Sequence, residues 1–169
     1  MATTSAIANS FKQQVLVEGH NLTNGADAIK LALYTSSATM GAGTTAFSTN
    51  QESSGTNYSS GGSTLTNQTP ALDGSTAVAD FSDLTFSNVT VTSRACMLYN
   101  STNGNKAVCV IDFGADKTAT AGDFVVVFPA ASSSAGIIRL AWRFKKMPLT
   151  AFNFKAGVNK EETDYANKG

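Results

Sequence analysis

The chain has 169 residues, of which 42% are apolar and 14% charged, and its 12 basic and 12 acidic side chains give a formal net charge of zero. This length suffices for one domain with a hydrophobic core, and a composition poor in charge but containing aromatic residues argues against global disorder. The balanced charge excludes a chain-wide polyanion-binding signature, and a chain with only two cysteines has no disulfide framework.

The N-terminus, MATTSAIANSFKQQVLVEG, contains neither the basic region nor the apolar run of a secretory signal. No apolar stretch of the sequence is long enough to span a bilayer. We therefore expect a soluble protein that is made in the cytoplasm and does not bind membranes.

A short helix is predicted near the N-terminus, over about residues 6–18. Its apolar side chains recur every four residues, at Ile7, Phe11 and Val15. Ser10 and Gln13 have the spacing of a capping box, and Gly19 is a suitable C-terminal stop. Because Ser10 interrupts the periodic stretch, a helix of two turns that begins there is the alternative.

From Ile29 onward the sequence has the pattern of β structure. The run IKLALYT, residues 29–35, alternates in the way typical of a strand with one buried face. Six further runs are short, rich in β-branched and aromatic residues and separated by turn residues: 77–81, 84–92, 95–100, 106–113, 124–128 and 137–144. The side chains expected to fill the core are Leu31, Leu33, Val108, Val110, Val125 and Val127.

The strand pattern predicts an all-β domain over residues 1–144, a β-sandwich or jelly-roll-like fold with a short N-terminal helix and an extended C-terminal arm over residues 145–169. The clearest local unit is a hairpin, since two apolar runs flank Asn103-Gly104. This hairpin brings Cys96 and Cys109 near each other on adjacent strands. Neither cysteine has the neighbours of a metal site, so buried free thiols are expected.

Residues 36–66 are rich in serine, threonine, glycine and asparagine. Structureless loops longer than about 12–15 residues are uncommon inside compact domains. We expect a long surface loop with an irregular edge strand around residues 44–48. Its only large anchors are Phe47 and Tyr58, and we expect both to contact a neighbouring subunit that orders the loop.

No catalytic, cofactor or metal site is predicted, and the protein is expected not to be an enzyme. A nucleophilic triad needs a base, and the only histidine, His20, sits beside the predicted helix stop, where a capping or surface role is the simpler interpretation. The aspartates of the strand ends lack the loop spacing of calcium ligands and are interpreted as solvated turn residues: Asp80, Asp83, Asp112, Asp116 and Asp123.

Charge is unevenly distributed, since residues 1–138 have a net charge of −4 and residues 139–169 a net charge of +4. After the last predicted strand, basic and aromatic side chains alternate, and the candidate interaction residues are Arg143, Phe144, Lys145, Lys146, Phe152, Phe154 and Lys155. Such a segment can dock onto an acidic neighbouring subunit, pack on its own domain, or bind nucleic acid. Because the body is acidic, a second copy of this chain is the preferred partner, and nucleic acid is the least favoured.

Three stretches in succession carry a resemblance to a known family: IKLALYTSSATMGAGTTAFSTNQESSGTNYSSGGSTLTNQT, then ALDGSTAVADFSDLTFSNVTVTSRACMLYNSTNGNKAVCVIDFGADKTATAGDFVVVFPA, then AGIIRLA. Over about residues 11–141, the chain resembles small virion-associated proteins of tailed bacteriophages, common in marine and environmental phages. The resemblance implies a structural role in the virion and supplies no catalytic motif. The residues after Ala141 lie beyond the resemblance.

We therefore expect a capsid decoration or cement protein that acts as a small symmetric oligomer in the virion. Its expected partners are its own copies and other virion proteins such as the major capsid protein. The alternatives are a component of the tail or of the head–tail connector, or a module on the virion that binds host glycans through Tyr58 and the hydroxyl-rich loops.

Overall fold

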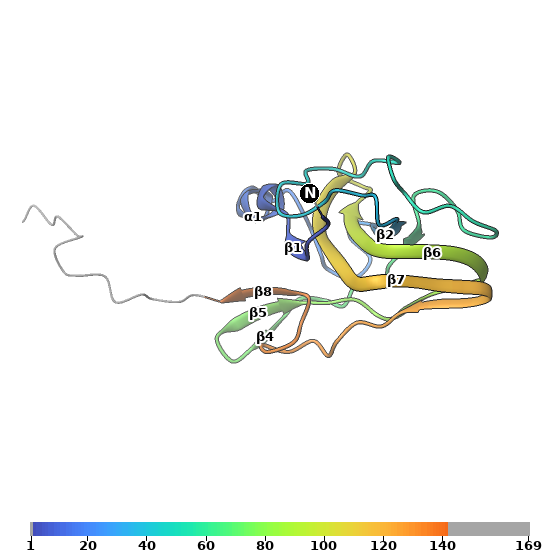
Figure 1. The fold of residues 1–169 in the computed structure, drawn as a ribbon. Helices are drawn as coiled ribbons and strands as arrows, with labels where there is room; N and C mark the ends of the chain where they lie inside the picture. The colour runs from blue at the N-terminus through green and yellow to red at the C-terminus, as the bar shows by residue number, and fades with distance from the viewer. Residues whose placement is uncertain (1, 142–169) are drawn as a thin grey trace, which may run out of the picture.

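The computed structural model describes residues 2–141, which form a mostly β structure with one short helix near the N-terminus (Figure 1). The elements in chain order are β1 (Ala6–Ile7), α1 (Asn9–Gln14), the 3₁₀ helix η1 (Val15–Val17), β2 (Ile29–Tyr34), β3 (Ser63–Thr64), β4 (Ala71–Asp73), β5 (Thr76–Ala79), β6 (Leu84–Asn100), β7 (Lys106–Val126) and β8 (Ile138–Ala141). The strands pair antiparallel in two sheets, with orders β1-β7-β6-β2-β3 and β4-β5-β8.

The predicted all-β, sandwich-like fold with a short N-terminal helix is confirmed. The predicted arm, residues 145–169, lies outside the described residues. Within residues 2–141, no helix combines the length and the apolar character needed to cross a membrane.

The hairpin of β6 and β7 forms the long curved spine of the molecule (Figure 1). The hairpin is the predicted one, but its connection covers residues 101–105, and the positive φ values of 64° and 56° belong to Gly104 and Asn105 and not to the pair Asn103-Gly104. Each of the two strands, β6 and β7, joins two runs that the sequence predicts as separate strands. In the polar middle of the hairpin the two strands stay paired, but the register shifts at several bulges, where Asn88 and Ala121 adopt positive φ.

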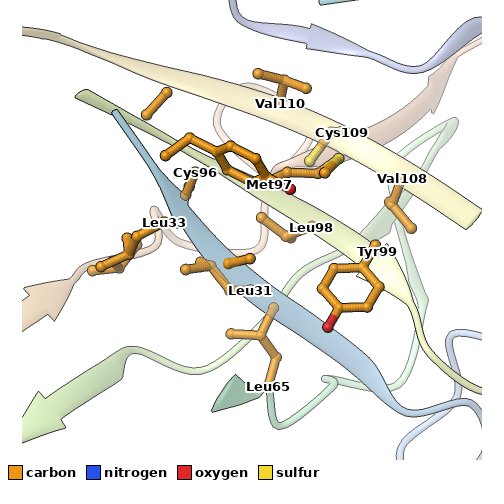
Figure 2. Close-up of a cluster of buried hydrophobic side chains, with 14 of the residues drawn as sticks. Leu31, Leu33, Leu65, Cys96, Met97, Leu98, Tyr99, Val108, Cys109 and Val110 are labelled. Carbon is orange, nitrogen blue, oxygen red and sulfur yellow. The ribbon is translucent and has the colours of Figure 1, made fainter. Parts of the chain in front are cut away.

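Strand β2 is buried on both faces, so the prediction of one buried face is wrong. Leu31 and Leu33 pack in the cluster of Figure 2 with side chains of β6 and β7, but Ala32 and Tyr34 of the opposite face are buried as well. The segment 36–66 covers this opposite face of β2. The Tyr34 hydroxyl donates a hydrogen bond to the carbonyl oxygen of Ser48, in that segment, at 2.6 Å.

Of the predicted core positions, Val108 and Val110 are buried, but Val125 and Val127 are 50% and 70% exposed. Their neighbours take the core positions: Phe124, Val126 and Phe128. A shift of one residue exchanges the two faces of an extended chain, so the prediction at these two valines is wrong. Aromatic packing determines which face of this segment is buried. Phe124 packs against Phe113 and Phe128 packs against Phe81, with ring centroids 6.1 Å and 5.7 Å apart.

The predicted helix over residues 6–18 is too long. Ile7 lies in β1 and pairs with Cys109, and α1 begins after an N-cap at Ala8 that makes no side-chain hydrogen bond. The capping box is therefore wrong, and the Ser10 hydroxyl is buried without a hydrogen-bond partner among the described residues. The helical turns end near Gly19 as predicted, although the residue in the left-handed conformation is Glu18.

Candidate interaction surfaces

The carboxylates of the strand ends accept hydrogen bonds from backbone N–H groups. Asp80 accepts a hydrogen bond from the N–H of Phe81 at 2.9 Å, and Asp83 accepts one from the N–H of Phe128 at 2.8 Å. Residues 2–141 contain no group of three or more His, Cys, Asp or Glu side chains placed to hold a metal ion. The interpretation of Asp80 as a solvated turn residue is wrong, because this carboxylate is buried.

His20 is part of a polar network that fastens the N-terminal segment to the hairpin. Its Nε2 lies 2.7 Å from Oε1 of Gln14, and its Nδ1 lies 3.0 Å from Nδ2 of Asn100. Since an amide NH₂ only donates, Nδ1 accepts and Nε2 carries the proton. Asn100 also donates to Oδ2 of Asp27 at 2.6 Å.

The network favours a neutral His20. Burial lowers the pKa of His20 below its usual value of 6.5, the nearby cation of Lys106 lowers it further, and Asp27 opposes both. Both ring nitrogens are thus engaged in hydrogen bonds that connect separate segments of the chain, which is a structural role.

The segment 36–66 is fastened by Glu52. This carboxylate accepts hydrogen bonds from the Tyr58 hydroxyl at 3.0 Å, from the Ser60 hydroxyl at 2.7 Å and from the N–H of Gly61 at 2.7 Å. The Tyr58 hydroxyl in turn accepts a hydrogen bond from the N–H of Leu33, in β2, at 2.8 Å. Contacts within the chain therefore order this segment.

Of the two predicted loop contacts, Tyr58 is buried with 9% of its surface exposed. Phe47 is half-buried and stacks on Tyr99, with centroids 4.5 Å apart. The expectation that a neighbouring subunit orders the loop is corrected by these contacts, and an additional subunit contact at Phe47 stays a prediction. The predicted edge strand at 44–48 is reduced to a single bridge between Ala46 and Lys106.

The predicted interaction residues of the arm lie outside the described residues: Arg143, Phe144, Lys145, Lys146, Phe152, Phe154 and Lys155. The described chain ends at Ala141, in β8 of the small sheet.

A cleft of about 620 Å³ with a mainly apolar lining separates α1 and η1 from this small sheet, and we call it the helix–sheet cleft. Both walls lie at the same end of the molecule in Figure 1. The lining side chains include Phe11, Val15 and Leu22 on one wall and Ala77, Ile138 and Leu140 on the other. Glu18 is the charged side chain of the lining, at the end of η1.

The sheet wall of the cleft continues onto an exposed apolar face. The register places Leu72 opposite Ala77 and Ala77 opposite Leu140, so that these three side chains form a row across the sheet. Leu72 is 77% exposed and Leu140 is 54% exposed. A contiguous apolar face beside an open cleft is typical of an interaction surface.

A second apolar cleft, of about 310 Å³, lies beside the end of β7, and its lining includes Phe113, Phe124, Val127 and Ile137. It is about half the volume of the helix–sheet cleft.

Comparison with models of protein families, with curated proteins and with solved structures finds no match to this chain.

Sequence reasoning misses the helix–sheet cleft because its walls come from three distant parts of the chain, residues 11–23, 70–79 and 138–140. The one available signal is Leu72, a leucine between Pro70 and Gly74 that has no predicted strand to belong to.

Proposed function

We propose that the protein is a non-enzymatic structural component of a tailed-phage virion, and that it decorates or cements the capsid through contacts between subunits. The observation that carries this proposal is the apolar face of the β4-β5-β8 sheet with the helix–sheet cleft beside it. The resemblance of residues 11–141 to small virion-associated proteins supports the same role.

Burial of this face favours association. Apolar surface removed from water contributes roughly 25 cal/mol per Å², so an exposed row that contains Leu72 and Leu140 favours a subunit contact over solvent. The polar groups support a structural role too, since Glu52, His20 and Asp83 are engaged with other parts of the same chain. Association requires no chemistry beyond these surfaces.

The test is the copy number of the protein in purified virions, measured by quantitative mass spectrometry against the major capsid protein. We expect one copy per capsid subunit, or a simple fraction of that number. A small fixed copy number, such as the number of subunits in one ring, would indicate a role in the tail or connector and not capsid decoration. Absence from the particle would overturn the structural role and favour a binding module.

A further inference from the structure

We propose that the helix–sheet cleft receives the C-terminal segment, residues 142–155, of a second copy of this chain. The proposal rests on the structural role proposed above and gives that role a contact site. Phenylalanine side chains of the segment fill the cleft, and its basic side chains face the acidic body of the receiving copy.

The cleft has the size and chemistry of a site for apolar side chains. Its volume of about 620 Å³ lies within the range of roughly 300–1,000 Å³ that is usual for pockets that bury a ligand. Phe11, Val15 and Leu22 face Ala77 and Ile138 across it. Aromatic anchors in such pockets supply much of the binding energy of protein interfaces.

The C-terminal segment has the complementary sequence, WRFKKMPLTAFNFK. It contains four aromatic and four basic side chains and no acidic one, whereas residues 1–138 have a net charge of −4. Glu18, at the rim of the cleft, provides a local acidic group. Complementary charge of this kind orients an apolar segment and raises its rate of association.

The direction of β8 favours a second copy as the source of the segment. Ile138 pairs with Ala79 at the inner end of the sheet, and Ala141 pairs with Thr76 beside the turn between β4 and β5. The chain therefore leaves its own cleft at the outer tip and would have to reverse within a few residues to enter it. The segment of another copy needs no such reversal.

The length of the segment permits the exchange. Residues 142–155 span roughly 45 Å when extended, which exceeds the radius of gyration of roughly 14 Å expected for a domain of this size. A segment anchored at Ala141 thus reaches well into an adjacent copy.

Disulfide trapping in the full-length protein tests the proposal. Thr23 is exposed and lines the cleft, and Asn153 lies between two phenylalanines of the segment. One chain carries Thr23→Cys and the other, made longer by an N-terminal tag, carries Asn153→Cys. The native Cys96 and Cys109 are buried and do not compete.

After mixing and mild oxidation, we expect a disulfide-linked heterodimer at least ten times more abundant than with Thr120→Cys, an exposed control on β7 outside the cleft lining. Yields equal to that control would overturn the proposal. Trapping at Val127→Cys instead would assign the segment to the second cleft. In a chain that carries both Thr23→Cys and Asn153→Cys, a crosslinked monomer as the main product would assign it to its own chain.

A second measurement uses the mass of the assembly by light scattering. Leu140→Asp changes an exposed residue of the cleft wall, so we expect a folded protein whose self-association weakens at least tenfold, whereas Val127→Asp leaves it unchanged. Equal effects of the two variants would overturn the proposal. Trapping in the cleft together with absence from virions would refute the phage role alone, and presence in virions without trapping would refute the cleft contact alone.

Discussion

Gly62 lies so close to β2 that a methyl group on its Cα would be 1.8 Å from the carbonyl oxygen of Leu31. Gly62 also has a φ of 66°, so both its conformation and its missing side chain are required. This contact holds the end of the hydroxyl-rich segment against the buried strand.

Gly62→Ala should therefore destabilise the fold severely, by about 4 kcal/mol or more, because backbone must move to relieve the overlap. The matched control is Gly104→Ala, which has a φ of 64° and no atom within 4 Å of the added methyl group. We expect Gly104→Ala to lower the free energy of unfolding by only roughly 1–2 kcal/mol, which is the cost of the left-handed conformation for alanine. Urea unfolding measures both, and equal losses would refute the close-contact explanation.

Tyr58→Phe should lower the free energy of unfolding by about 1–3 kcal/mol, because the buried N–H of Leu33 loses its acceptor and Glu52 loses a donor. Tyr34→Phe is the control, since it removes a donor from the carbonyl of Ser48, an exposed residue that water can reach. The loss should be smaller for Tyr34→Phe in urea unfolding. A larger loss for Tyr34→Phe than for Tyr58→Phe would show that the Tyr58 hydroxyl does not stabilise the fold and that Tyr58 acts by packing alone.

The stability of the protein should depend on the protonation of His20. Because burial lowers the pKa of His20 below 6.5, the unfolded chain binds a proton more readily than the folded one as the pH falls. The contribution of His20 is therefore complete above pH 6.5 and decreases as the pH falls below it. We expect the free energy of unfolding to fall between pH 6.5 and pH 5.

In the His20→Gln variant, the free energy of unfolding should no longer fall between pH 6.5 and pH 5, but it should still fall at lower pH. That acid loss belongs to carboxylates such as Asp112, whose pKa is lowered below 3.8 by its hydrogen bond to Arg94 and by the N–H of Gly114. Urea unfolding at half-unit pH steps measures both ranges. An unchanged slope in the variant between pH 6.5 and pH 5 would show that His20 does not titrate with folding.

Cys96 and Cys109 should not react with thiol reagents in the native protein. Both thiols are buried, burial raises the pKa of Cys109 to about 12, and it raises the pKa of Cys96 as well, so little thiolate forms at pH 8. A colorimetric thiol assay should find no reactive thiol before unfolding and two in urea. Rapid reaction of the native protein would contradict the burial of these strands.

Phe128→Ala should cost about 3 kcal/mol, whereas Val127→Ala should change the free energy of unfolding by less than about 0.5 kcal/mol. The difference follows from the observed side of each residue, since Phe128 packs against Phe81 and Val127 is exposed. Thermal and urea unfolding of both variants provide the measurement. Equal losses would restore the original assignment of Val127 to the core.

The features that the sequence predicts correctly depend on neighbouring residues. The hairpin forms because Gly104 and Asn105 tolerate positive φ in its connection, and the strands on either side carry their own apolar pattern. The burial of Leu31 and Val108 follows from the same local alternation.

The features that it misses depend on distant partners. The segment 36–66 covers the large sheet because Phe47 stacks on Tyr99 of β6 and the Tyr58 hydroxyl accepts a hydrogen bond from β2. The side that Val127 takes depends on Phe81, more than forty residues earlier, because Phe81 packs against the neighbouring Phe128. The candidate site is of this kind, since Leu72 and Leu140 become one surface only when β5 pairs with both of their strands.

The strand order leaves much of the outer edge of β7 without a partner. Among residues 2–141, β7 pairs on that side with the two residues of β1, at Cys109 and Val110, and forms the single bridge between Lys106 and Ala46. An unpaired edge is a template for growth of the sheet by strands from other molecules. Along β7, positive φ values at Gly114 and Ala121 break the straight run of hydrogen-bonding groups, and Asp116 and Lys117 place charge between them. These four residues therefore protect the unpaired edge of β7 from the addition of strands from other molecules.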